Sequence, residues 1–221
     1  MKKQLIINSL VVLFTLSPLA YLFFTWQSIP DTFVTRFKFS TTIEDEGGKE
    51  ALLIATFVIS LAPSLLYIAL RNLKSIDPMV NDATPKSSFN KLGTALAIFL
   101  TIANFLFVVS VKNNSVISVN TVFVGVGFLI ALAGNYMNNI KPNYVAGFRV
   151  SWTLNDPDNW RKTHHLASKV WFAGGVLLIV ISFALPSQII VPMLILVMLI
   201  LIIVPCVYSY RIHKSKSHNL N

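Results

Sequence analysis

The residues that could carry chemistry are few, and they form no complete catalytic set. His164 and His165 are adjacent, so on a helix their side chains point about 100° apart and cannot share one metal ion without further ligands. The HExxH, GxSxG and Walker A patterns are absent. The single cysteine, Cys206, excludes an intramolecular disulfide. We expect no enzyme and no cofactor. Two roles stay open for the histidines, metal binding or hydrogen bonding at a membrane interface.

The elements that would position these residues are membrane spans. The chain has 221 residues, 54% of them hydrophobic and 12% charged, whereas a soluble domain carries about 25% charged residues. Apolar residues gather in six blocks of about twenty, the length that crosses a hydrocarbon layer of about 30 Å. These blocks are 5–26, 51–70, 92–111, 116–136, 166–185 and 189–208. The sequence predicts an all-α integral membrane protein with about six transmembrane helices, forming a single membrane domain over 1–221.

The basic residues predict the orientation of these helices. Of the 18 Lys and Arg residues, 14 lie in the N-terminus, in segments 71–91 and 137–169, and in the C-terminus. Loops rich in Lys and Arg stay in the cytoplasm. We therefore expect both termini and the 137–169 segment to be cytoplasmic, and the 27–50 segment to be extracellular. The net charge of +9 is explained by topology, so we expect no direct contact with nucleic acid.

The outer 27–50 segment differs from an ordinary loop. Phe33, Phe37 and Phe39 alternate with more polar residues, which predicts a short strand or an amphipathic cap. The acidic run at 44–46 is read as a solvated turn, with a cation or partner contact as the alternative.

The spans themselves are poor in groups that transport uses. Their centres contain no Asp, Glu, Lys, Arg or His, which weakens the interpretation as an ion-coupled transporter. Asn8, Asn104 and Asn120 remain inside the membrane. Such residues form hydrogen bonds between helices or line a substrate path, and the sequence leaves both readings open.

The densest polar segment is 134–169, which is too polar for lipid and unusually rich in aromatic residues. It leaves the fourth span, turns near Pro142, and re-enters as a helix capped by Asp156 with Pro157 in its first turn. Trp152, Trp160, Tyr136 and Tyr144 suit the lipid headgroup belt as well as a binding surface. The candidate binding or structural residues of this segment are Asn135, Tyr136, Lys141, Pro142, Asn143, Tyr144, Gly147, Arg149, Trp152, Thr153, Trp160, Arg161, Thr163, His164 and Lys169.

Five short motifs in this segment carry a family resemblance. In order they read GNYM, IKPNY, G-x-R at 147–149, WTL at 152–154 and WRKTH at 160–164. Together they resemble the signature of the SdpI family of bacterial membrane immunity proteins. The usual Gly-Lys after the histidine turn reads Ser168-Lys169 here. In the outer segment Ile29-Pro30 is kept, but Arg36 stands where the family has His.

The resemblance implies a function that needs no catalysis. It suggests a multi-pass protein of the bacterial cytoplasmic membrane that protects its producer against a secreted peptide toxin. The implied partners are that toxin, a cytosolic regulatory protein and the lipid bilayer. The alternative from another class is a small multi-helix transporter or exporter.

We also expect polar side chains of the signature segment, residues 134–169, to come together in the folded protein. Lys141, Asn143, Arg149, Trp152, Arg161 and His164 are predicted to converge in one polar cluster at the cytoplasmic face. Arg149 is the expected organiser, because a guanidinium can donate to several carbonyls or stack on Trp152.

Overall fold

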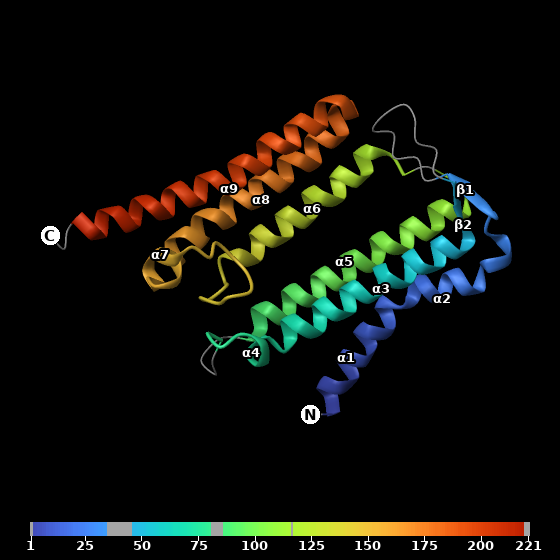
Figure 1. Ribbon diagram of the computed structural model, residues 1–221, viewed down its shortest axis with the longest axis horizontal. Helices are drawn as coiled ribbons and strands as arrows, with labels where there is room; N and C mark the ends of the chain where they lie inside the picture. The colour runs from blue at the N-terminus through green and yellow to red at the C-terminus, as the bar shows by residue number, and fades with distance from the viewer. Residues whose placement is uncertain (1, 35–45, 81–85, 116, 219–221) are drawn as a thin grey trace. The chain divides into compact units, whose positions relative to one another are not determined.

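The computed structural model describes residues 2–34, 46–80, 86–115 and 117–218 (Figure 1). It is built almost entirely from helices. In chain order the elements are α1 (Lys2–Thr15), α2 (Ser17–Phe24), η1 (Trp26–Ser28), β1 (Thr32–Val34), β2 (Glu46–Gly48), α3 (Lys49–Arg71), α4 (Leu73–Ile76), α5 (Lys86–Lys112), α6 (Val119–Met137), α7 (Ser151–Leu154), α8 (Pro157–Ala184) and α9 (Ser187–His218).

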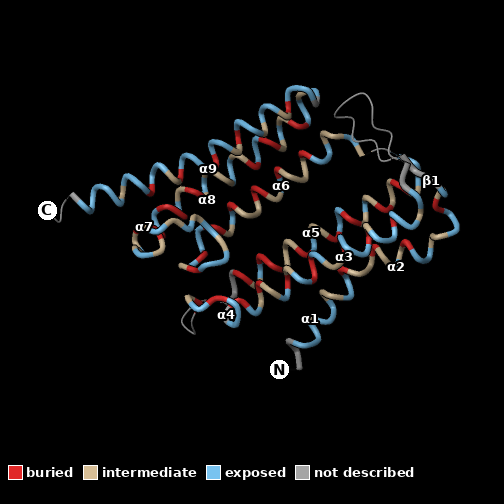
Figure 2. Tube along the Cα trace, in the orientation of Figure 1, coloured by how far each residue is buried: buried red, intermediate tan, exposed pale blue. Residues whose placement is uncertain are grey.

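Five of these helices, α3, α5, α6, α8 and α9, are long and apolar enough to cross a membrane. The pair formed by α1 and α2 makes a sixth span if it is counted as one bent helix. Exposed residues recur along the long helices (Figure 2). They include large apolar residues such as Phe24 and Phe183. Lipid accommodates such residues, because helices satisfy their own backbone hydrogen bonds. The predicted all-α membrane protein with about six spans is confirmed.

The first span is bent, which the apolar pattern did not predict. Helix α1 ends at Thr15 and α2 begins at Ser17, and their axes differ by 44°. Pro18 lies in the first turn of α2. Its missing N–H and its ring break the helical ladder at Leu16. Pro63, Pro192 and Pro205 lie inside α3 and α9 without ending those helices.

The 27–50 segment contains a short strand, one of the two alternatives predicted for it. Strands β1 and β2 pair antiparallel, with Thr32 opposite Gly48 and Val34 opposite Glu46. Lys49 and Asp31 form an ion pair of 2.8 Å beside this ribbon. Phe33 lies in β1, whereas Phe37, Phe39, Glu44 and Asp45 lie outside the described residues.

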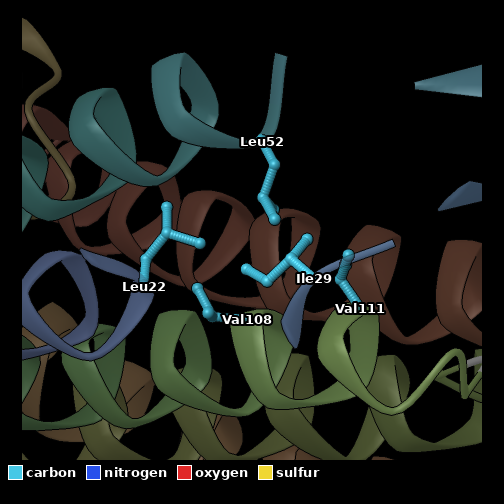
Figure 3. Packing of buried hydrophobic residues seen from close by; sticks show 5 residues of the cluster. All are labelled: Leu22, Ile29, Leu52, Val108 and Val111. Carbon is cyan, nitrogen blue, oxygen red and sulfur yellow. The ribbon is translucent and has the colours of Figure 1, made fainter. Parts of the chain in front are cut away.

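The chain forms two compact units, and the first consists of Met1–Arg71 and Asn90–Val119. Leu22, Ile29, Leu52, Val108 and Val111 form its apolar core, with α2, α3 and α5 each contributing (Figure 3).

Polar contacts join the helices of this first unit. Thr15 of α1 hydrogen-bonds to Ser64 of α3. The Tyr67 hydroxyl donates to Asn8 Oδ1 at 3.0 Å and receives a hydrogen bond from Arg71. Asn8 therefore hydrogen-bonds between helices, one of the two readings left open above.

The second unit consists of Asn72–Phe89 and Asn120–Asn221. Helices α8 and α9 form a hairpin, and together with α6 they enclose a core of Ile130, Leu178, Val197 and Leu201. Asn120 of α6 donates to the carbonyls of Ser182 and Leu185 at 2.9 and 3.1 Å, so it too bonds between helices. That the two units act as one membrane domain stays a prediction.

Helices α6 and α8 approach each other through small residues. A Cβ at Gly127 would lie 2.8 Å from the Gly175 carbonyl oxygen, and one at Gly134 would lie 2.9 Å from the Trp171 carbonyl carbon. Small residues permit such close backbone approach in membrane helices. The polar segment that connects these two packed helices runs from the end of α6 at Met137 to the start of α8 at Pro157.

Candidate functional site

The segment between α6 and α7 is a tight turn built around Asn143, which is fully buried. Its Nδ2 donates to the carbonyls of Lys141 and Ala146 at 2.8 and 3.1 Å. Its Oδ1 accepts the N–H groups of Val145 and Ala146 at 2.8 and 2.7 Å. An asparagine can replace a backbone turn in this way. One side chain thus fixes the path of residues 141–146.

Two charged side chains hold the main chain of Tyr144. Asp77, only 1% exposed, accepts the Tyr144 N–H through Oδ2 and the Met79 N–H through Oδ1. Arg149 donates to the Tyr144 carbonyl. Both backbone hydrogen-bonding groups of Tyr144 are therefore satisfied, while its side chain stays 51% exposed.

Trp160 and His164 attach this loop to α8. Trp160 is buried and donates from Nε1 to the Ile140 carbonyl at 2.8 Å. His164 Nε2 accepts the Phe148 N–H at 3.0 Å, so Nδ1 carries the proton and donates to the Trp160 carbonyl at 2.8 Å. The two rings stack with centroids 4.0 Å apart. Both imidazole nitrogens are engaged within the fold, which supports the hydrogen-bonding role over metal binding.

Only glycine suits position 147, because of the backbone conformation there and because a side chain would have no room. Its φ is +114°, a value that side-chain-bearing residues rarely adopt, and an added Cβ would collide with the His164 imidazole. The glycine of the G-x-R motif therefore permits the hydrogen bond between Phe148 and His164.

The short helix α7 links the loop to α9. The buried Thr153 hydroxyl accepts the Val150 N–H at 3.2 Å and donates to the Phe148 carbonyl at 2.6 Å. Trp152 Nε1 donates to Ser209 Oγ at 2.7 Å, and its ring stacks on His213.

The start of α8 is held by the same part of α9. Asn159 donates to the Ser209 carbonyl at 3.0 Å and accepts from the Thr163 hydroxyl at 2.9 Å. All three residues are fully buried. The signature segment is thus bonded to both α8 and α9.

The predicted cap of α8 is present. Asp156 Oδ1 accepts the N–H groups of Asp158 and Asn159 at 3.0 and 3.2 Å, and Pro157 occupies the first turn. Oδ2 pairs with Lys216 of α9 at 2.7 Å. This hydrogen bond to the Lys216 ammonium group is the main cause that lowers the pKa of Asp156 below its ordinary value.

The structure brings the predicted residues together only in part. Asn143, Arg149 and His164 serve one hydrogen-bonded loop, and Trp152 joins it to α9. Lys141 is exposed, and Arg161 is exposed and paired with Asp158 at 3.0 Å. The expected single polar cluster with Arg149 at its centre is therefore replaced by a chain of local bonds, in which Arg149 donates to the Tyr144 carbonyl.

The remaining candidates are distributed around this loop. Asn135 and Lys169 are exposed, and Tyr136 and Pro142 are half-buried. His165 is exposed and bonds to Asn138 at 2.9 Å. That any of the predicted residues binds a partner stays a prediction.

Three residues that sequence reasoning missed are central to the segment. They are Asp77, Asn159 and Ser209. Asn159 lies between the WTL and WRKTH motifs, directly before Trp160, and its place one turn before Thr163 is a signal that could have revealed it. Asp77 and Ser209 lie 67 and 57 residues from their partners Tyr144 and Trp152, so no local pattern identifies them.

Fold and site together define a multi-pass membrane protein with a buried, hydrogen-bonded polar segment. Among the described residues there is no group of three or more His, Cys, Asp or Glu side chains suited to a metal ion. Residues 139–209 match the SdpI/YfhL protein family. The resemblance to the SdpI family that the motifs predicted is therefore confirmed over this segment.

One curated relative is the protein named immunity protein SdpI of Bacillus subtilis (strain 168). It is 37% identical over 90 residues, which cover 41% of this chain. The match spans 43% of the relative's own length. No solved structure matches the chain significantly.

Proposed function

We propose that this protein is a non-enzymatic membrane immunity protein that protects its cell against a secreted peptide toxin. The observation that supports this is the 37% identity to immunity protein SdpI, together with the family match over 139–209. Asn143, Trp160 and His164 belong to the motifs that carry the resemblance, and their hydrogen bonds hold the segment in one conformation. A binder needs a fixed surface and no nucleophile.

The proposed setting is the bacterial cytoplasmic membrane. Both termini and the 137–169 segment lie in the cytoplasm, and the 27–50 segment lies outside, in accordance with the distribution of Lys and Arg. The toxin meets the outer face or the spans. The cytoplasmic segment stabilises the fold and is available to a cytosolic regulatory protein.

A specific observation favours the transporter as second candidate. Asn104 of α5 donates to Ser60 of α3 at 2.9 Å, but Asn104 Oδ1 and Thr56 Oγ1 are buried without a hydrogen-bond partner among the described residues. Unsatisfied polar atoms inside a membrane are costly. They are expected where a polar substrate passes.

The experiment that separates the two functions compares protection with transport. A toxin-sensitive bacterium expressing the chain is challenged with secreted peptides of neighbouring strains, and the purified chain is tested for peptide flux in vesicles. Survival without flux supports immunity by binding. The alternative result is that cells survive only when the chain transports the peptide. If an Asn104→Leu variant of unchanged abundance loses both survival and peptide flux, the protection is due to export.

A further inference from the structure

The loop between α6 and α7, residues 138–150, is called the signature loop. Tyr144 and Val145 form its tip, and their exposed side chains make an apolar surface on an otherwise polar segment. Tyr144 is 51% exposed and Val145 is 41% exposed. Their neighbours are not free to rearrange and cover them. Asn143 fixes the turn, Asp77 holds the Tyr144 N–H, and Arg149 holds the Tyr144 carbonyl. The loop therefore presents these two side chains in a set position.

The two tryptophans considered for the headgroup belt, Trp152 and Trp160, are used within the fold. Trp160 is 1% exposed and bonded to Ile140, and Trp152 is bonded to Ser209 and packed on Tyr210 and His213. Among the described aromatic residues of this loop, Tyr144 is the one whose exposed fraction exceeds one half.

Depth along α8 places this tip beside the lipid headgroups. The loop is bonded to α8 at Trp160 and His164. At about 1.5 Å per residue, these positions lie about 9 Å and about 3 Å outside Leu166, where the predicted fifth span begins. The headgroup layer extends about 5–8 Å beyond the hydrocarbon on each side. His164 thus lies within the headgroup layer and Trp160 just beyond its outer edge, so the loop that they hold lies at the border between headgroups and water.

Charge around the tip fits an anionic surface. Lys141 and Arg149 are exposed on the same loop, and neither is ion-paired with a described carboxylate. The acidic residue nearest in the following helix, Asp158, is already paired with Arg161 and Lys162. The cytoplasmic leaflet carries anionic lipids, which attract exposed Lys and Arg near the membrane.

We infer that the Tyr144–Val145 tip inserts into the headgroup layer, where Lys141 and Arg149 meet anionic lipid phosphates. Tyrosine suits this layer because its ring is apolar and its hydroxyl is polar. The inserted tip anchors the loop to the bilayer at a point away from α8 and α9. This inference does not depend on the immunity function.

Depth measurement by spin labelling tests the insertion. A nitroxide is attached at Val145→Cys in a Cys206→Ser background, and the full chain is reconstituted in phosphatidylcholine vesicles with and without phosphatidylglycerol. Leu177→Cys, at an exposed position near the middle of the predicted fifth span, serves as the hydrocarbon control. Ser217→Cys, nine residues beyond the end of the predicted sixth span, serves as the water control.

Insertion predicts that collisions of the Val145 label with a water-soluble nickel chelate are several-fold fewer than at Ser217, with oxygen collisions between those of the two controls. Equal nickel accessibility at 145 and 217 overturns the insertion, and would indicate a solvent-facing surface for a protein partner. Phosphatidylglycerol is expected to lower nickel accessibility at Val145, and Lys141→Gln is expected to weaken this effect. An unchanged effect in Lys141→Gln overturns the assignment of Lys141 to anionic headgroups.

Discussion

The Nε2 atom of His164 accepts the main-chain N–H of Phe148 across 3.0 Å, while Nδ1 donates to the Trp160 carbonyl one turn earlier on the same helix. A neutral imidazole thereby bridges two positions that lie sixteen residues apart in the sequence. The histidine of the WRKTH motif acts as a hydrogen-bonding bridge, and its ring is packed between Trp160 and Phe148.

His164→Ala is expected to destabilise the protein by about 2–4 kcal/mol, because it leaves a buried N–H without an acceptor and a cavity beside Trp160. Thermal unfolding in detergent measures the change. His165→Ala is the matched control, since His165 is exposed, and it should cost less than about 0.5 kcal/mol. Equal losses in the two variants would contradict the bridging role.

Gly147→Ala is expected to cost about 1–3 kcal/mol, because the residue must keep a positive φ and its new methyl group meets His164. The collision part is testable by a double-mutant cycle with His164→Ala. The double variant should be less destabilised than the sum of the two single variants. Strict additivity would show that only the backbone conformation of Gly147 matters.

The pair of Asp156 and Lys216 predicts a dependence on pH. The pKa of Asp156 is lowered in the folded protein, so the pair stabilises the fold above the unfolded-state pKa, and this contribution is lost as the pH falls through the folded-state pKa. Asp156→Asn keeps a helix cap but removes the charge. The difference in melting temperature between the parent and Asp156→Asn should therefore shrink on acidification below pH about 4. A constant difference would mean that the cap, and not the ion pair, carries the effect.

The orientation in the membrane is open to direct labelling. In a Cys206→Ser background, an impermeant thiol reagent should label Asn113→Cys in intact cells, because Asn113 is exposed directly after α5. Ser217→Cys should be labelled only after the cells are opened, since the C-terminus is predicted to be cytoplasmic. The reverse pattern would invert the topology.

Much of the fold could be predicted because lipid imposes a simple rule. Five predicted spans reappear as single helices and the first as the bent pair α1 and α2. The cap formed by Asp156 and Pro157 is readable from adjacent residues. Pro18, Pro63, Pro192 and Pro205 can each kink a helix, but hydropathy does not tell which of them bends its span, because it treats each proline as one more position in an apolar block. Proline inside α3 and α9 leaves those helices unbroken, so the effect of each proline depends on its surroundings.

The candidate site could be located from its motifs, but its internal bonds could not. Asp77 and Ser209 contribute from distant parts of the chain, and only folding places them beside Tyr144 and Trp152. Residue type also misled the expectation for Arg149, whose five donors suggested a hub. In the fold, buried amide and imidazole side chains, Asn143 and His164, hold most of the loop instead.

The survival of toxin-sensitive bacteria tests the central proposal most directly. Cells expressing the parent chain are expected to survive a peptide challenge that kills cells without it. Arg149→Ala, which releases the Tyr144 carbonyl, is expected to lose most of the protection at matched membrane abundance, while His165→Ala keeps it. The immunity function would be contradicted if every secreted peptide of the neighbouring strains killed the cells that express the parent chain, with its membrane abundance confirmed. Full protection by Arg149→Ala would show that the held conformation of the loop is not needed for it.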